Sequence, residues 1–213
     1  MRKIHNRRMI AGLLFGVAIL TGCGGGAKVP DTVESSSLII EKDGQITAHV
    51  VDTFDKDYYD LDGLKDMAEE DLKNFNDAQS SDAAVTLERV EMVPESSDVV
   101  VTYRFPGTDA YGKFTGSNLY FGTIGEAADA GYDFDGINQM LFSVTGDKSM
   151  VSSDLLKSGM DKKHVILLEE GTRVYCPYKV ALISENADVM EDGSIDTSGI
   201  FREEYPVIIV LDK

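Results

Sequence analysis

Apolar segments of four to eight residues, separated by turn residues, recur along the chain from about residue 37. Two β-hairpins are predicted, from the apolar pairs 37–41 with 45–52 and 84–92 with 98–105. Asp43-Gly44 joins the first pair, and the polar segment 93–97 joins the second. Either connection favours antiparallel pairing of two β-forming neighbours. The first half of this region is therefore expected to be rich in antiparallel sheet.

In other stretches, the apolar residues recur with the period of a helix. Helices are predicted over 60–75, over 124–130, and as one or two short segments within 137–159. In the first, apolar residues recur at steps of three and four, and Asp60 stands where an N-cap is expected. Thr123 and Glu126 have the spacing of a capping box for the second, and Gly131 is expected to end it. Both of these helices thus carry their own start or stop signals.

The later strands decide the fold class. They are predicted at 164–168, at 172–183 with an interruption at Pro177, and at 206–211. The segment 206–211 is apolar on both faces, which indicates a central strand. Hairpins separated by helices, without a repeating βα rhythm, predict an α+β fold in which a few helices pack on antiparallel sheet. One domain is expected over 37–213, with a break near 106–118 as the fallback.

The first 23 residues have a different pattern. A basic start is followed by an apolar run from Met9 to Leu20, about 12 residues or roughly 18 Å as a helix. That is short for a hydrocarbon core of about 30 Å, and the arrangement is typical of a secretory signal peptide. Leu20-Thr21-Gly22-Cys23 resembles the lipobox of bacterial lipoproteins. The resemblance implies that the Cys23 thiol receives a diacylglyceryl group and that signal peptidase II cuts before it.

The residues after Cys23 suit such an anchor. Gly24, Gly25 and Gly26 begin a Gly/Ser-rich stretch that ends at Ser35-Ser36-Ser37, a composition that behaves as flexible coil. Two acyl chains on one cysteine provide stable anchoring. The expected organisation is a signal peptide at 1–22, a flexible tether at 23–36 and a domain at 37–213. The expected location is the outer face of the cell membrane, with lipid on Cys23.

Charge excludes several partners. Residues 1–22 hold four of the 20 Lys and Arg residues and none of the 37 Asp and Glu residues, so the mature chain has a formal charge of −21. Phosphate backbones and anionic headgroups repel such a chain, and nucleic acid is not an expected partner. Attachment to the membrane is expected to come from the lipid, which leaves an envelope protein as a candidate partner.

The segment Gly107 to Lys113 matches the G-x-x-x-x-G-K pattern of a phosphate-binding loop. Phe114 follows it, although the motif requires Ser or Thr at that place to hold magnesium. A helix should come next, whereas the sequence continues with Gly116-Ser117-Asn118. We therefore interpret the segment as a Gly-rich loop without nucleotide.

Catalytic side chains are scarce. The mature chain holds two histidines, His49 and His164, and a single cysteine beyond Cys23. That cysteine, Cys176, precedes Pro177 and so is expected in extended backbone, as a buried structural thiol. No serine-hydrolase, β-lactamase or zinc-protease motif is present. A hidden Asp/Glu pair for glycan hydrolysis stays an alternative.

Acidic clusters raise the question of calcium. Asp192, Ser194, Asp196, Ser198 and Glu203 have the spacing of EF-hand positions, but Thr197 replaces the required glycine. A second cluster spans Asp52 to Asp62. Helix capping and turn formation explain both. No metal or other cofactor is expected, and Asp192, Asp196 and Glu203 remain weak calcium candidates.

Half of the aromatic residues lie between 103 and 142. Tyr111, Phe114 and Tyr120 are the candidates for a contact surface, because tyrosine provides contact area at a low entropy cost. The favoured alternative places these aromatics in the core and at its rim.

Two segments, DKDYYDLDGLKDMAEEDLKNFN and LYFGTIGEAADAGYDF, resemble uncharacterised lipoproteins of Gram-positive bacteria. That resemblance implies an envelope location and no established activity. The favoured function is a lipid-anchored, non-catalytic binding or assembly module, and the alternative is a cell-wall or glycan hydrolase. A solute receptor is disfavoured, because about 177 residues are few for two lobes that close on a ligand.

Overall fold

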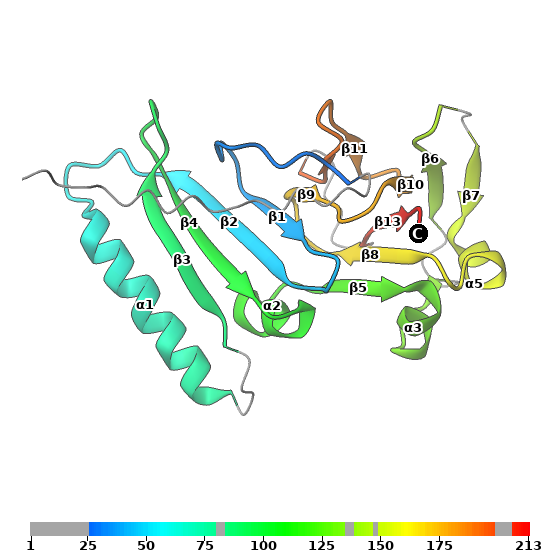
Figure 1. Cartoon of the computed structure of the whole chain (residues 1–213), viewed down its shortest axis with the longest axis horizontal. Coiled ribbons are helices and arrows are strands. Elements are labelled where there is room, and N and C mark those ends of the chain that lie inside the picture. The colour runs from blue at the N-terminus through cyan, green and yellow to red at the C-terminus, as the bar shows by residue number, and fades with distance from the viewer. Residues whose placement is uncertain (1–25, 80–83, 135–138, 147–148, 199–205) are drawn as a thin grey trace, which may run out of the picture.

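The computed structural model describes residues 26–79, 84–134, 139–146, 149–198 and 206–213 (Figure 1). Two sheets make up most of it. Sheet A has the order β11 (Asp188–Val189), β12 (Ile195–Asp196), β9 (Arg173–Tyr175), β1 (Ser37–Ile40), β2 (Ile46–Thr53), β4 (Asp98–Phe105) and β3 (Thr86–Met92). Sheet B has the order β5 (Leu119–Thr123), β8 (His164–Leu168), β13 (Val207–Leu211), β10 (Val180–Ser184), β6 (Met140–Ser143) and β7 (Met150–Ser152).

Both predicted hairpins are present in sheet A. β1 pairs antiparallel with β2, and β3 with β4, while β4 lies against β2 along its whole length. Gly44 lies in the first turn with φ of 88°, a left-handed conformation that glycine adopts without strain. On the other side of β1, β9 adds in parallel. β1 is therefore hydrogen-bonded along both of its edges.

β13 is the central strand of sheet B, as predicted from its apolar sequence. It pairs antiparallel with β8 on one side and with β10 on the other, and all five of its residues are buried. The predicted interruption at Pro177 is also confirmed. It separates β9 in sheet A from β10 in sheet B, so the chain changes sheets at the proline.

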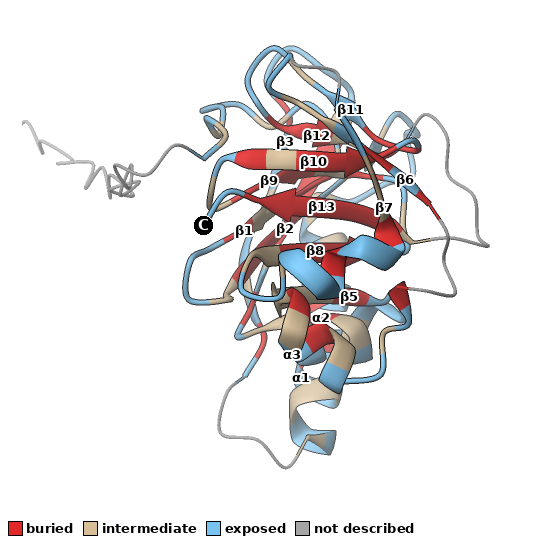
Figure 2. Ribbon diagram, turned by 90° about the vertical axis from the view of Figure 1, so that its right-hand side faces the viewer, coloured by how far each residue is buried: buried red, intermediate tan, exposed pale blue. Residues whose placement is uncertain are grey.

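Two apolar cores lie on the two faces of sheet B. The first core fills the space between the sheets, with Ile40 and Ile46 from sheet A against Ile166 and Ile209 from sheet B. In Figure 2, sheet B accordingly lies in front of β1, β2 and β9. The second core lies under α3 (Ile124–Asp129), η1 (Ser153–Leu155) and α5 (Leu156–Gly159). Side chains alternate along β13, so this strand supplies both cores.

The predicted starts of two helices are confirmed. α1 (Leu61–Ala78) begins after Asp60, whose carboxylate accepts a hydrogen bond from the Gly63 N–H at 3.0 Å. α3 begins with the full capping box of Thr123 and Glu126. Gly131 follows α3 with φ of 98°. α1 packs on β3 at the edge of sheet A, and its Leu72 reaches the first core.

The interpretation of 107–113 as a loop was wrong. Thr108–Thr115 forms a helix, α2, which ends at Gly116 with φ of 79°. Ala110, Tyr111 and Phe114 share one side of this helix and pack on the first core, and this burial outweighs the cost of Gly112 in a helix interior. The next segment, β5, was not predicted as a strand.

The prediction of only helices within 137–159 was also partly wrong. β6 and β7 form there first, and η1 and α5 follow. β6 pairs with the open edge of β10, which places Leu141 in the second core and leaves Phe142 partly exposed. Pairing with an existing strand edge thus overrode local propensity.

The α+β class is confirmed, with two mostly antiparallel sheets and helices packed on them. Within the described ranges, no helix combines the length and apolar character needed to span a bilayer.

Replacing Ile209 by alanine tests the contribution of β13 to the first core. Ile209 is fully buried in the first core, so Ile209→Ala should lower the free energy of unfolding by about 2–5 kcal/mol. Val50→Ala is the control, because Val50 is 49% exposed; its effect should stay below about 1 kcal/mol. Urea unfolding measures both. Equal small effects would contradict the assigned core.

Candidate functional site

Residues 26–36, which we call the strap, lie across the face of sheet A that points away from sheet B. The Lys28 N–H donates to the Asp192 carbonyl at 3.2 Å. At the other end, the Ser36 hydroxyl accepts from the Val51 N–H at 3.0 Å, and Thr172 Oγ1 donates to the Ser36 carbonyl at 3.1 Å. Most of the predicted tether is therefore attached to the sheet.

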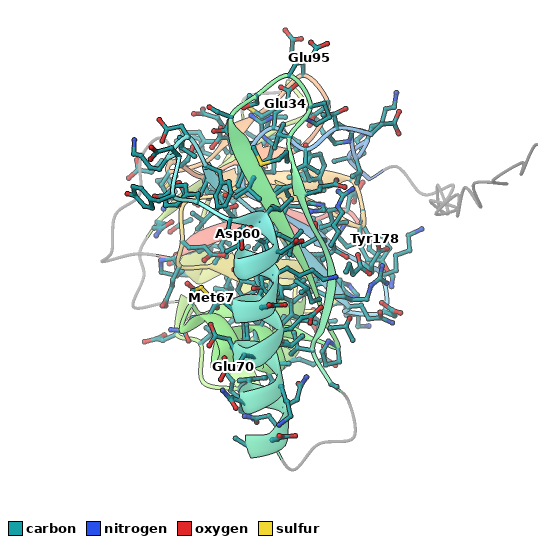
Figure 3. The ribbon with its side chains drawn as sticks, turned by 90° about the vertical axis from the view of Figure 1, so that its left-hand side faces the viewer. Glu34, Asp60, Met67, Glu70, Glu95 and Tyr178 are labelled. Carbon is teal, nitrogen blue, oxygen red and sulfur yellow. The ribbon has the colours of Figure 1, made fainter. Side chains whose placement is uncertain are left out.

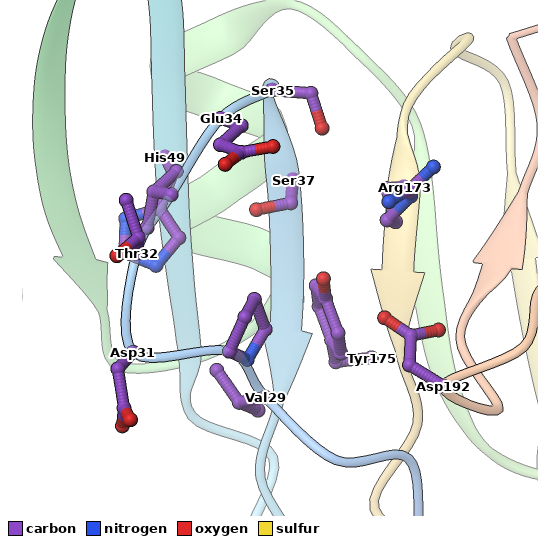
Figure 4. A pocket seen from close by; sticks show the side chains of 12 residues that line it. Val29, Asp31, Thr32, Glu34, Ser35, Ser37, His49, Arg173, Tyr175 and Asp192 are labelled. Atoms are coloured by element: carbon purple, nitrogen blue, oxygen red, sulfur yellow. The ribbon is translucent and has the colours of Figure 1, made fainter. Parts of the chain in front are cut away.

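A cavity of about 360 Å³ lies between the strap and the sheet (Figure 4), near the lower end of the usual range for small-molecule sites. Ser37, His49, Arg173 and Tyr175 line it from the strands. Their positions follow from strand alternation, because each is next to a residue of the first core and so points to the opposite face. Asp192 and strap residues 29–35 complete the wall.

His49 is buried and hydrogen-bonded on its inner side. Its Nδ1 lies 3.0 Å from Thr102 Oγ1, and the same oxygen accepts from Arg89 Nε at 3.1 Å. The Thr102 hydroxyl can either donate to an unprotonated Nδ1 or accept from a protonated one, so both neutral tautomers keep this hydrogen bond. Burial, followed by the Arg89 charge, lowers the pKa of His49 to about 4. His49 is thus a neutral side chain at pH 7.

Arg173, Tyr175 and Asp192 form the polar end of the cavity. Tyr175 hydrogen-bonds with both of the others. Burial raises the pKa of Tyr175, and the Asp192 charge adds to this shift. Burial acts to raise the pKa of Asp192 as well, but hydrogen bonds from Ser194 and the Arg173 charge bring it below its usual value. At neutral pH, the cavity therefore presents a guanidinium, a phenol and a carboxylate.

Arg173 is incompletely satisfied. Its Nη2 lies 3.6 Å from an Asp196 carboxylate oxygen, but its Nε is buried and has no hydrogen-bond partner within the described structure. An unpaired buried donor costs about 1–3 kcal/mol. An acceptor that reached this N–H would recover that free energy.

Three acidic side chains line the cavity. Asp31, Glu34 and Asp192 are spread around the rim in Figure 4. A general acid in glycan hydrolysis needs a raised pKa. The carboxyl groups whose pKa shifts in the described ranges, Glu126, Asp192, Asp196 and Asp212, all shift downward.

The calcium candidates are engaged elsewhere. One Asp192 carboxylate oxygen accepts from the Ser194 N–H and hydroxyl, and Asp196 repeats this pattern with Ser198. Glu203 lies outside the described residues. In the part of the chain that the structure describes, no three Asp, Glu, His or Cys side chains converge in a way that could hold a metal ion.

The proposed aromatic contact surface was wrong, and the core alternative describes these side chains. Tyr111 is 3% exposed and donates to Glu170, while Phe114 packs against Phe75 and the first core. The Tyr120 ring contacts the Tyr132 ring at a tilted angle of 53° beside the second core. Among the described residues, the exposed aromatics are Phe142 at 37% and, in the connection before α1, Tyr58 at 74% and Tyr59 at 42%.

Cys176 is buried at the first core, as expected. Burial raises the pKa of its thiol to about 12, opposite to the direction that activates a nucleophile. His164 lies between the rings of Phe121 and Tyr178, and burial lowers its pKa. Cys23, the predicted lipidation site, lies outside the described residues.

No family model matches this chain, and neither the curated proteins nor the solved structures contain a match. Its function must therefore be argued from the cavity itself. Sequence reasoning missed this site because it joins the strap and the adjoining β1 to β2 and to the distant β9 and Asp192. A polar residue at every second position of β9, Arg173 and Tyr175, was the one available signal.

The lowered pKa of His49 predicts how stability depends on pH. Between pH 6.5 and about 4 the unfolded chain binds a proton at His49 that the folded chain does not, so acidification should destabilise the fold by up to about 1.4 kcal/mol per pH unit. This contribution is fully present above pH 6.5. Urea unfolding from pH 4.5 to 7.5 measures it. His49→Gln should have a flatter slope in this window, and an unchanged slope would refute the assignment.

Cys176 should be unreactive in the folded protein. In a Cys23→Ala background, iodoacetamide at pH 7.5 should label it at least about 100-fold more slowly than in 8 M urea, because the thiol is buried and protonated. Mass spectrometry gives both rates. Comparable rates would show that the thiol is accessible.

Proposed function

We propose that this chain is a lipid-anchored protein of the bacterial cell envelope, exposed on the outer face of the membrane. The lipobox-like Leu20-Thr21-Gly22-Cys23, the basic start and the short apolar run support the anchor. An acidic body suits this arrangement, because a surface of one dominant sign keeps the domain soluble.

We propose further that the body is a binding module, and that the cavity under the strap is its site. The observation that carries this is the buried, unpartnered Nε of Arg173 at a cavity of ligand size, which a neutral His49 lines from the other side of β1. A ligand with a carboxylate or carbonyl oxygen could satisfy this donor. Ser37 and Tyr175 offer further hydrogen bonds at the same wall. The expected ligand is thus small, polar and rich in acceptors.

Binding is favoured over glycan hydrolysis because hydrolysis needs a protonated carboxylic acid. Asp192, the carboxylate on the sheet side of the cavity, is kept ionised by Ser194 and Arg173. The other acids of the rim belong to the strap.

The anchor is tested by Cys23→Ala. Wild type, expressed in a bacterium with lipoprotein processing, should partition into the detergent phase, and its N-terminal peptide should carry diacylglycerol on Cys23. The variant should lose that lipid and partition into the aqueous phase, because one signal peptide without acylation gives no stable anchor. Identical unlipidated behaviour of the two proteins would contradict the proposal.

The cavity is tested with a panel of amino acids, dipeptides, mono- and disaccharides and soluble muropeptides. At least one class should raise the Tm, since a ligand that binds only the folded state stabilises it. Arg173→Gln should weaken that binding by about 10-fold or more, the usual worth of a hydrogen bond to a charged group. Arg104→Gln is the matched control, because Arg104 pairs with Glu88 outside the cavity.

Two results would refute the binding module. The first is a Tm that no member of the panel changes, or a shift that Arg173→Gln leaves intact. The second is release of reducing ends from purified peptidoglycan that Asp192→Asn abolishes, which would establish the hydrolase instead.

A further inference from the structure

A basic and aromatic patch interrupts the acidic surface around Tyr178. Lys213 Nζ lies 4.5 Å from the centroid of the Tyr178 ring and donates to its hydroxyl at 2.7 Å. Lys42 Nζ lies 5.7 Å from the same centroid, on the β1–β2 turn. Lys179 is the next residue along the chain and is exposed. We call Tyr178 and these three lysines the Tyr178 patch.

The neighbouring charges leave the patch basic. Asp212 is next to Lys213 and pairs with a fourth lysine, Lys163, at 2.9 Å. Glu41 and Asp43 flank Lys42 on its turn and are exposed, and Asp43 accepts hydrogen bonds only from the neutral Gln45. The four lysines thus exceed these three acids by one charge. His164 contacts the Tyr178 ring and, with its lowered pKa, adds no charge at pH 7. Tyr178 itself is partly exposed among these groups.

The described chain begins beside this patch. Gly26 packs so closely on the residues before Tyr178 that a Cβ there would lie 2.5 Å from the Cys176 carbonyl oxygen. Gly26 is the third residue after Cys23, and an extended chain spans at most about 3.6 Å per residue. A lipid on Cys23 would therefore hold the Tyr178 side of the domain within roughly 11 Å of the headgroups.

We propose that the Tyr178 patch rests on anionic phospholipid headgroups, so that the lipid and the patch together fix the orientation of the domain. This inference depends on the proposed lipid anchor at Cys23. Lysines near an anionic surface are attracted within about one Debye length, about 8 Å at physiological salt. A tyrosine ring suits the same depth, because it is amphipathic and favours the membrane interface.

The rest of the surface makes the orientation selective. The next strap residues, Ala27 and Lys28, contact the turn between β11 and β12, which carries Glu191 and Asp192. Anionic headgroups repel this turn and attract the Tyr178 patch. The domain would therefore orient with Tyr178 toward the membrane. α1 presents its acidic outer face, with Glu70, on a different side of the molecule (Figure 3). The net negative charge thus opposes every other contact with the bilayer.

Lysine footprinting on the lipidated full chain tests the patch without mutation. The chain is reconstituted in vesicles of phosphatidylcholine alone or with one-third phosphatidylglycerol, and labelled with a membrane-impermeant acetylating reagent. Lys42, Lys179 and Lys213 should react about 5-fold more slowly on the anionic vesicles, and 0.5 M NaCl should remove this protection. Lys65 and Lys73, on α1, are the internal controls and should change less than about 2-fold.

Charge reversal sharpens the test. Lys42→Glu/Lys213→Glu should abolish the protection of Lys179, whereas Lys65→Glu/Lys73→Glu should leave it intact. If the three lysines react at the same rate on both vesicle types while Cys23 carries its lipid, the proposed contact of the Tyr178 patch with anionic headgroups is refuted. Absence of that lipid, seen in the mass of the N-terminal peptide, would overturn the anchor itself and with it this inference.

Discussion

The two-sided burial of β13 is the constraint on which the fold depends. Val207, Ile209 and Leu211 face sheet A, while Ile208 and Val210 face α3 and α5. Because one strand supplies both cores, neither layer can shift without disturbing the other. The position of sheet A against sheet B sets where the chain crosses at Pro177. That crossing in turn places Arg173 and Tyr175 on one side of it and Tyr178 on the other.

The charge of the whole chain and the charge of the Tyr178 patch lead to different conclusions about contact with a membrane. The formal charge of −21 on residues 23–213 argues against electrostatic contact with an anionic membrane. Interactions between exposed charges, however, decay within about a Debye length, so a contact depends on the groups that face it rather than on the total. The lysines around Tyr178 are gathered from the β1–β2 turn, the start of β10 and the C-terminal segment. The fold, and not the composition, creates that patch.

Features encoded within a few residues could be predicted from the sequence. The capping box of Thr123 and Glu126, the Asp60 cap and the apolar run of β13 each carry a local signal, and each is present. α2 was missed because its glycines favoured a loop over a helix in the sequence analysis. The burial of Tyr111 and Phe114 depends on contacts with Phe105, which comes from β4. The cavity was also missed because its residues come together only through tertiary contacts. His49, Arg173 and the strap meet only after sheet A has formed, and no short window of sequence contains them together.

The attachment of the strap has a mechanical consequence. An envelope protein held by its N-terminus receives any pull from the membrane or the wall along that end of the chain. Such a force would load the Lys28–Asp192 hydrogen bond first and the hydrogen bonds of Ser36 next. These few contacts would break one after another. β1 comes after them, and it is held along both edges by β2 and β9, so the same force would have to shear two ladders at once. If the proposed lipid holds the chain at Cys23, tension on it would therefore detach the strap and uncover the cavity before it unfolded the domain.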